Sequence, residues 1–169
     1  MASLEGRSCH ERWYRGAAVN YLETSQMRIL LVEDFKPYRA LAKSILRTNP
    51  NLDLISEAED GVAAVEQAQQ LKPDVILMDI GLPNLNDMAA ARRIRDLVPF
   101  SKIVFLTQET DIEVAREAFS LGAWGYVVKN RAATDLLPAL TSIMRGKRFV
   151  SRGLSGDGFT SPTVPQAAD

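Results

Sequence analysis

The sequence predicts an α/β fold, a doubly wound parallel sheet of five strands with helices on both faces. From Met27 onward, a short apolar run is followed five times by a longer segment with apolar residues at helical spacing. Such a βαβ series is typical of parallel sheets. Hydrophobic residues make up 46% of the 169-residue chain, which suits one globular domain with a substantial core.

The five predicted strands differ in how continuously apolar they are. The first, third and fourth runs are unbroken, as expected of central strands that helices cover on both faces. The second run alternates apolar and polar residues, which favours a place at the edge of the sheet. The predicted strands are residues 28–32, 52–56, 74–78, 102–106 and 126–128.

The first two helices are bounded by start and stop signals. Apolar residues share one helical face from Tyr38 to Leu46, and Pro50 ends that segment. Asp60 is the predicted N-cap of the second helix, over residues 61–71.

The last three helices show similar signals. Asp87 is the predicted cap of the third helix. Residues 110–113 have the spacing of a capping box, which predicts that the fourth helix begins there, at Thr110. Gly122 is its predicted C-terminal stop. The fifth helix is predicted to begin near Asp135, which places Pro138 in the first turn, where proline is tolerated.

The predicted domain spans residues 27–150, between two less regular ends. Residues 1–26 show no clean periodicity and are predicted to be a flexible extension; a docking helix in this stretch is the alternative. Residues 151–169 are rich in Ser, Gly, Pro and Thr, which predicts a flexible tail or a truncated linker.

Composition excludes several classes of protein. Lys and Arg (20) nearly balance Asp and Glu (21), so no overall basic field indicates nucleic-acid binding. The single cysteine, Cys9, cannot form an internal disulfide, and the single histidine, His10, excludes an internal multi-histidine metal site. No apolar run reaches the roughly 20 residues of a membrane span. We expect a soluble, cytoplasmic protein that binds neither nucleic acid nor membrane.

Polar side chains follow the predicted strands at the point where each strand ends. Glu33 and Asp34 follow the first strand, Asp79 the third, Thr107 the fourth and Lys129 the fifth. In open parallel sheets, ligands bind outside the carboxyl ends of the strands, where the strand order reverses. If the strand order is 2-1-3-4-5, that crevice lies between strands one and three.

The residue types at this edge indicate phosphoryl transfer. Three crowded carboxylates repel one another, so they hold either protons or a cation. An all-oxygen, carboxylate-rich site suits Mg²⁺. A carboxylate such as Asp79 can attack phosphorus while a metal and an ammonium neutralise the phosphoryl oxygens and a hydroxyl donates a hydrogen bond.

Three separated segments resemble response-regulator receiver domains: MRILLVED at residues 27–34, LMDIGLP at 77–83 and GAWGYVVK at 122–129. The resemblance covers roughly residues 27–150 and implies a flavodoxin-like doubly wound (βα)5 fold with strand order 2-1-3-4-5. Residues 89–95 and 146–151 are similar to the LuxR/FixJ-type subgroup. Only 19 residues follow Val150, too few for that subgroup's DNA-binding domain, so a stand-alone receiver and a fragment of a longer regulator both stay open.

The resemblance implies a role for each acidic residue. Asp79 would become an aspartyl-phosphate, with a sensor histidine kinase or phosphotransfer protein as the donor. Asp34, Asp79 and the backbone carbonyl of Gly81 would bind Mg²⁺ directly, and Glu33 would act mostly through a water. The chain would catalyse only its own phosphorylation and dephosphorylation.

The resemblance also implies how the signal would leave the site. Lys129 would pair with the phosphoryl group, Thr107 would move toward it, and the ring of the switch residue Tyr126 would turn inward. The output face would be the fourth helix, fifth strand and fifth helix, which is also a possible homodimer interface. The downstream protein partner is not indicated.

Three residues depart from the family pattern. Asp87 stands where glycine is usual, so a positive φ there would be unfavourable. Gln108 stands where a small residue is common and would narrow access to the phosphoryl group. Asn130 replaces the usual proline, so the placement of Lys129 must come from other contacts.

Two other functions compete with that of a phosphoacceptor. A pseudo-receiver would use the same fold as a binding module without phosphorylation, and the intact acidic site argues against it. A phosphatase with an aspartate nucleophile needs a second Asp two residues after the first, but Phe35 and Lys36 follow Asp34.

Overall fold

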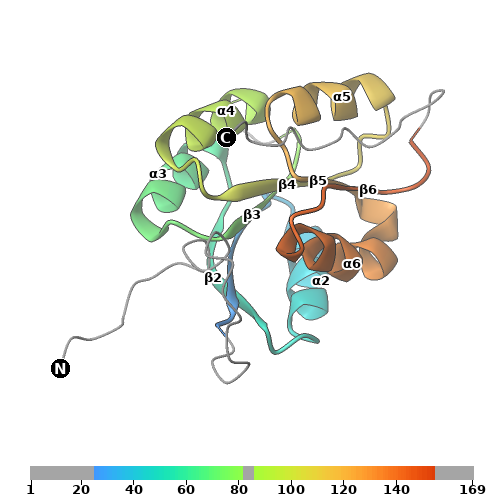
Figure 1. The fold of residues 1–169 in the computed structure, drawn as a ribbon, viewed down its shortest axis with the longest axis horizontal. Coiled ribbons are helices and arrows are strands. Elements are labelled where there is room, and N and C mark those ends of the chain that lie inside the picture. The colour runs from blue at the N-terminus through green and yellow to red at the C-terminus, as the bar shows by residue number, and fades with distance from the viewer. Residues whose placement is uncertain (1–24, 82–85, 155–169) are drawn as a thin grey trace.

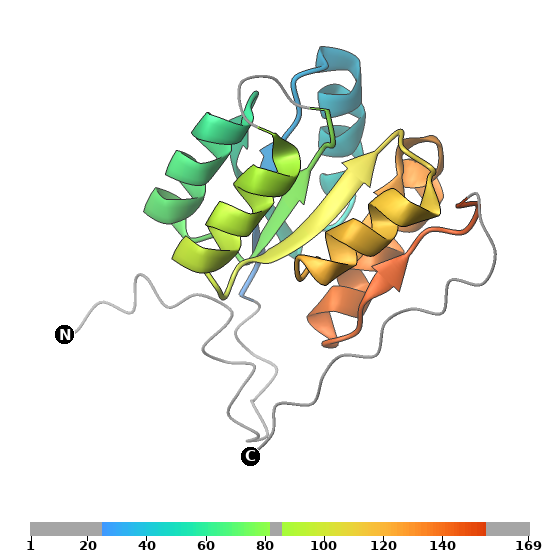
Figure 2. The same ribbon diagram turned by 90° about the horizontal axis from the view of Figure 1, so that it is seen from above.

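The protein is described by a computed structural model that covers residues 25–81 and 86–154. These residues form one parallel sheet in the order β2-β1-β3-β4-β5-β6 (Figures 1 and 2). The predicted fold class and the order of the first five strands are confirmed, with β2 at one edge. The strands are β1 (Met27–Val32), β2 (Leu52–Ala58), β3 (Val75–Met78), β4 (Lys102–Thr107), β5 (Gly125–Val128) and β6 (Phe149–Val150).

The sixth strand, β6, is absent from the sequence prediction, which ended with β5 at the sheet edge. β6 pairs in parallel with β5, Gly125 opposite Phe149 and Tyr126 opposite Val150. Two residues are too few to show the alternation that identifies a strand in a sequence. The edge of the predicted output face is therefore β6 rather than β5.

The predicted boundary of the domain at Val150 also moves. Ser151 is buried, and its N–H donates a hydrogen bond to the carbonyl of Tyr126 at 2.9 Å. The folded domain therefore includes Ser151, which had been placed in the tail. The expectations for residues 1–24 and 155–169, including the alternative docking helix, lie outside the described residues.

Helices cover both faces of the sheet (Figure 1). α3, α4 and α5 lie on one face, and α2 and α6 lie on the other. A short 3₁₀ helix, η1, joins β5 to α6. The helices are α2 (Lys36–Leu46), α3 (Gly61–Leu71), α4 (Asp87–Leu97), α5 (Ile112–Ser120), η1 (Lys129–Arg131) and α6 (Ala132–Met144).

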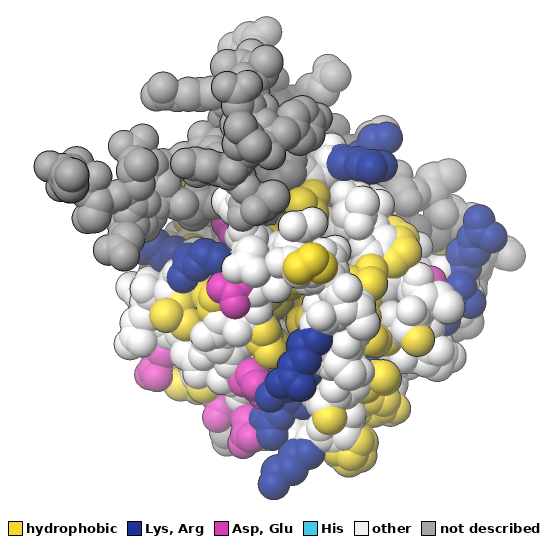
Figure 3. All heavy atoms as spheres, turned by 90° about the horizontal axis from the view of Figure 1, so that it is seen from below, with side chains coloured by type: hydrophobic (Ala, Val, Ile, Leu, Met, Phe, Trp, Pro, Cys, Tyr) yellow, Lys and Arg dark blue, Asp and Glu magenta, His cyan; other side chains and the backbone are white. Residues whose placement is uncertain are grey.

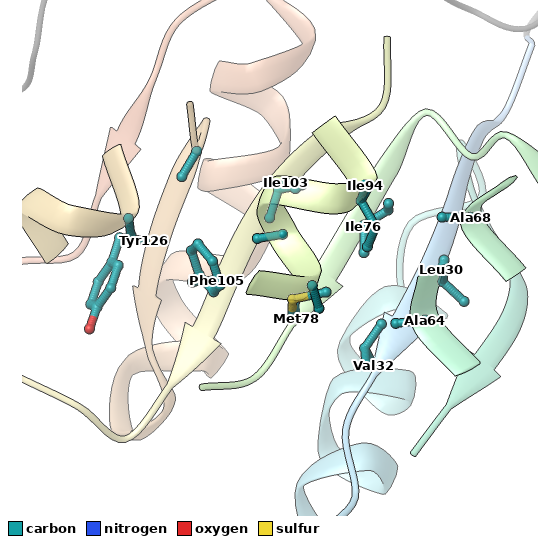
Figure 4. Close-up of a cluster of buried hydrophobic side chains, with 14 of the residues drawn as sticks. Leu30, Val32, Ala64, Ala68, Ile76, Met78, Ile94, Ile103, Phe105 and Tyr126 are labelled. Carbon is teal, nitrogen blue, oxygen red and sulfur yellow. The ribbon is translucent and has the colours of Figure 1, made fainter. Parts of the chain in front are cut away.

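The continuously apolar strands supply two cores, one on each face of the sheet. Successive side chains of a strand point to opposite faces. Leu30 and Val32 therefore join the core under α3, α4 and α5 (Figure 4), whereas Ile29 and Leu31 join the core under α2 and α6. Full burial of one such side chain contributes about 1.5–3 kcal/mol. The central strands are continuously apolar because helices cover them on both faces, as predicted.

Two predicted helix caps are displaced by one residue. The side chain of Asn86, not Asp87, caps α4 by accepting the N–H of Met88 at 2.9 Å. The side chain of Asp111, not Thr110, caps α5 by accepting the N–H of Glu113. In each case two neighbouring residues have side chains that can cap, and only the backbone geometry selects between them.

The predicted start of the last helix was also wrong. α6 begins at Ala132, three residues before Asp135, because η1 leads directly into it. Pro138 therefore lies inside the helix rather than in its first turn. The predicted stop at Gly122 is confirmed, since this residue follows α5 with φ +95°.

The surface carries mixed charge. On the face drawn in Figure 3, Lys and Arg side chains lie beside Asp and Glu side chains. Two ion pairs join α2 to β2 and the loop after it: Arg39 contacts Glu59 at 2.6 Å, and Lys43 contacts Glu57 at 2.5 Å. Within residues 25–81 and 86–154, no helix has the length and apolar character to cross a membrane.

Candidate functional site

The strand ends meet at one edge of the sheet because all the strands run in the same direction. Glu33 and Asp34 follow β1, Asp79 follows β3, and Lys129 follows β5. The backbone ties the first and third ends together, since the N–H of Asp79 donates to the carbonyl of Val32 at 3.0 Å. Residues up to 96 positions apart in the sequence thus form one site.

Three carboxylates form the acidic part of the site. One oxygen each from Glu33, Asp34 and Asp79 lies within 4.8 Å of the others. Glu33 is 1% exposed and Asp79 is 9% exposed, whereas Asp34 is open to solvent. The predicted acidic residues are therefore together, two of them inside the domain and one at its surface.

Lys129 is the cation of the site. Its Nζ lies 2.6 Å from Glu33 Oε2 and 2.9 Å from Asp79 Oδ2. The same ammonium lies 4.3 Å from the ring centroid of Tyr38, a cation–π contact. One ammonium faces three carboxylates, so the site keeps an excess of negative charge that a divalent cation would neutralise.

The pKa of the Asp79 carboxyl is raised above its usual value. Burial raises the pKa of its carboxyl to about 6, and the charge of Glu33 adds to the increase, while the hydrogen bond and charge of Lys129 and the N–H of Ile80 oppose it. A carboxylate with a raised pKa in a crevice is typical of a functional group rather than of a solvated loop residue.

The loop after β3 holds the Asp79 carboxylate and Gly81. Asp79 Oδ1 accepts the N–H of Ile80 at 2.8 Å. Gly81 has φ +100°, a conformation that favours glycine, and its N–H donates to the Asp87 carboxylate. Asp87 is the first residue of α4 and is buried, so the strain that was expected there from a positive φ does not arise. Its carboxylate instead holds the loop.

The two predicted switch residues both contact Glu109. The Thr107 hydroxyl, at the end of β4, accepts the N–H of Glu109 at 3.1 Å. The Tyr126 hydroxyl donates to the carbonyl of Glu109 at 3.0 Å, and burial raises the pKa of this hydroxyl. The Tyr126 ring is fully buried against Phe105 (Figure 4). In this structure the ring lies inward.

The other departures from the family pattern can also be located. The Gln108 amide donates to the Tyr38 hydroxyl, which connects the loop after β4 to α2 beside Lys129. Asn130 lies in η1, and no peptide bond of the described residues is cis. The peptide bond between Lys129 and Asn130 is therefore trans.

A buried carboxylate, a buried ammonium, a hydroxyl and a cluster of carboxylate oxygens are the groups that phosphoryl transfer uses. The family model of the response regulator receiver domain matches residues 29–141 of this chain. The chain belongs to this receiver family. The family that was predicted from three short segments is confirmed.

Relatives of this receiver domain are bacterial regulators. The chain is 30% identical over 126 residues to the transcriptional regulatory protein DegU of Brevibacillus brevis and 32% identical over 130 residues to the oxygen regulatory protein NreC of Staphylococcus aureus. These matches cover 75% and 76% of the chain but only 53% and 60% of the relatives, so the chain spans little more than half their length.

A solved structure supports the predicted likeness of this receiver domain to the LuxR-type subgroup. A LuxR-family two-component response regulator from Aurantimonas superimposes with a TM-score of 0.72 at 30% identity, covering 76% of this chain and 91% of that one. The predicted likeness of the receiver domain to the LuxR-type subgroup is therefore confirmed.

Sequence reasoning missed three residues that complete the site. Glu109 links Thr107 to Tyr126 through its backbone, which any residue type could provide. Tyr38 was predicted only as part of a helix face, although its ring lies beside the Lys129 ammonium. Ser151 was placed in the tail, although its hydroxyl accepts the N–H of Val128, the residue before Lys129, at 3.1 Å. No local pattern distinguishes these residues, because their contacts join segments far apart in the sequence.

Proposed function

We propose that Asp79 accepts a phosphoryl group from the phosphohistidine of a sensor histidine kinase or phosphotransfer protein, in a Mg²⁺-dependent reaction. The observation that carries this proposal is the 2.9 Å contact between Lys129 Nζ and Asp79 Oδ2 inside a cluster of three carboxylates. A carboxylate nucleophile beside a cation is what phosphoryl transfer requires. The only reaction of the chain would be its own phosphorylation and dephosphorylation.

The residues present fit a magnesium ion. Asp34, Asp79 and the backbone carbonyl of Gly81 would bind it directly, and Glu33 would contribute through a water. The donors are all oxygen, and their negative charge exceeds what Lys129 offsets. When bound, the ion would neutralise charge on the phosphoryl oxygens.

The side chains then have distinct tasks in the transfer. An oxygen of Asp79 attacks phosphorus, the new P–O bond forms, and the P–N bond of the phosphohistidine breaks. The bond's electron pair stays on the imidazole nitrogen, which leaves as a neutral imidazole when the other ring nitrogen carries a proton. The Lys129 ammonium already contacts Asp79, so it can pair with the phosphoryl oxygens without a large movement of its side chain.

The output would follow from the added charge. The phosphoryl group carries about −1.5 to −2 charge, as on Ser, Thr or Tyr, and this charge replaces the single negative charge of the ionised Asp79 carboxylate. Movement of the Thr107 hydroxyl toward that charge would break its hydrogen bond with the N–H of Glu109, whose carbonyl accepts the hydroxyl of Tyr126. The change would reach the face of α5, β5 and α6, edged by β6, where a downstream protein or a second copy of the chain could bind.

Phosphotransfer to the wild type and to Asp79→Asn tests the proposal. Both proteins are incubated with a small phosphoramidate donor and Mg²⁺, and labelling is followed by intact mass. We expect the variant to keep its unmodified mass and the wild type to gain the mass of one phosphoryl group, a gain that is lost without Mg²⁺. Equal labelling of the two proteins would refute the role of Asp79.

A further inference from the structure

Ser151, the residue after β6, is joined by hydrogen bonds to both sides of Lys129. Its hydroxyl accepts the N–H of Val128 at 3.1 Å and donates to Asp135 Oδ2 at 2.7 Å. Its own N–H donates to the carbonyl of Tyr126 at 2.9 Å. We propose that Ser151 is a positioning residue for Lys129, so that the segment after β6 is part of the phosphoacceptor site.

The Ser151 hydroxyl takes the place of a backbone acceptor at the end of the sheet. β6 pairs with β5 over only two residues. The N–H of Val128 lies beyond that pairing, and a buried N–H needs an acceptor. A serine hydroxyl can accept one hydrogen bond while it donates another. Ser151 therefore satisfies the end of β5 and reaches Asp135 with the same oxygen.

Asp135 gives this contact a fixed anchor in the first turn of α6. Arg131 Nε donates to Asp135 Oδ2 at 3.0 Å, and the Thr134 hydroxyl donates to Oδ1 at 3.0 Å. Burial raises the pKa of Asp135, but these hydrogen bonds, that of Ser151 and the charge of Arg131 outweigh it and lower the pKa. The acceptor is therefore charged, which strengthens the hydrogen bond from Ser151.

The contacts of Ser151 span the short segment that carries Lys129. Lys129 is the first residue of η1, between the end of β5 at Val128 and the start of α6. A 3₁₀ segment has poorer hydrogen-bond geometry than an α-helix, so it needs support from outside. A displacement of about 1 Å at a reacting group can cost on the order of a hundredfold in rate.

The proposal rests on the proposed role of Lys129 in phosphoryl transfer. The test compares Ser151→Ala with Ser101→Ala in the full chain. Ser101 is a matched control, because it is also buried and its hydroxyl donates to the carbonyl of Pro73 at 2.6 Å, at the opposite end of the sheet. Three quantities are measured: the labelling rate constant at saturating phosphoramidate and Mg²⁺, the affinity for Mg²⁺, and the exchange rate of the Val128 amide proton.

We expect Ser151→Ala to be labelled about tenfold more slowly and its Val128 amide to exchange about tenfold faster, with unchanged Mg²⁺ affinity. Ser101→Ala should keep the wild-type rate even if its unfolding midpoint falls. Labelling of Ser151→Ala at the wild-type rate, or an equal loss in Ser101→Ala, overturns the proposal. If Ser151→Ala does not fold, Ser151→Cys takes its place, since a thiol of similar volume forms only weak hydrogen bonds.

The NMR signal of the Lys129 side-chain Cε separates this proposal from the proposed function. If the wild type is not labelled at all, the proposed function fails. The role of Ser151 is then decided by the Lys129 signal without any phosphoryl donor. A shift in Ser151→Ala but not in Ser101→Ala supports positioning, and an unchanged signal overturns it.

Discussion

The two ends of the sheet each hold a buried aspartate and a lysine, but in different arrangements. At the carboxyl end, Lys129 contacts Glu33 and Asp79 directly, at 2.6 and 2.9 Å. At the amino end, Lys102 Nζ donates to the carbonyl of Ile143 at 3.1 Å, whereas Asp74 Oδ2 accepts the N–H of Arg28 at 2.8 Å.

The difference is one of charge balance. At the amino end, both charged groups make contacts that hold the fold together. Lys102 donates to the carbonyl of Ile143 in α6 and lies 4.2 Å from the Trp124 ring centroid. Asp74 accepts the N–H of Arg28 in β1. At the carboxyl end, three carboxylates share one ammonium. The same residue types therefore stabilise the structure at the amino end. At the carboxyl end they leave an excess of negative charge, which a bound cation can neutralise so that a phosphoryl group can enter.

The largest expected effect separates the two lysines. Lys129→Met removes the cation beside Asp79, so we expect phosphoramidate labelling to slow by about a hundredfold or more. Lys102→Met keeps the site intact and should label at close to the wild-type rate. Rate constants at saturating Mg²⁺ check both variants. Similar losses in the two lysine variants would contradict the distinction between the ends.

Asp79 should make stability depend on pH in the metal-free protein. Its pKa is about 6 in the folded state and 3.8 in the reference state, so the folded protein binds this proton more tightly. The resulting cost is absent below about pH 4, grows between about pH 4 and 6, and is complete above that range. It amounts to about 2–3 kcal/mol.

Chemical denaturation of Asp79→Asn checks this dependence. The variant should be more stable than the wild type at pH 8 by about 2–3 kcal/mol, and the gain should shrink as the pH falls toward 4. Asp74→Asn, at the other end, should bring no such gain, because Asp74 lies outside the cluster of Glu33, Asp34 and Asp79 and its charge is attracted by Lys102. An Asp79→Asn protein no more stable than the wild type at pH 8 would show that Lys129 already balances the charge.

Magnesium binding should depend on the carboxyl end alone. Asp34→Asn removes one charged ligand at the surface of the cluster, so we expect about tenfold weaker Mg²⁺ binding, equivalent to about 1.4 kcal/mol. Titration calorimetry of Asp34→Asn and Asp74→Asn measures the contrast. Unchanged affinity in Asp34→Asn would remove this residue from the proposed ligand set.

The smallest expected effect is at the amino end. Lys102→Met loses one hydrogen bond to the carbonyl of Ile143 and the contact with Trp124. We expect the free energy of unfolding to fall by about 1 kcal/mol. Urea denaturation at pH 7 measures the loss. A much larger loss would mean that the attraction between Lys102 and Asp74 contributes more to stability than the hydrogen bond and the ring contact do.

The contrast between the ends could be predicted only in part. The apolar runs and the positions of Glu33, Asp34, Asp79 and Lys129 after strand ends were enough to predict the parallel sheet and the acidic site, because parallel strands bring their carboxyl ends to one edge. Helix caps were displaced by one residue at Asp87 and Thr110, since neighbouring side chains could serve equally well.

By itself, the sequence determined the fold class and the set of chemical groups at one sheet edge, since hydrophobic periodicity and strand ends are local patterns. Its resemblance to receiver domains implied the order of five strands. Only the tertiary structure decided the sixth strand, the inward ring of Tyr126 linked to Thr107 through Glu109, and the hydrogen bond between Ser151 and Val128. These features depend on hydrogen bonds between segments far apart in the chain, and no local pattern encodes such a partner.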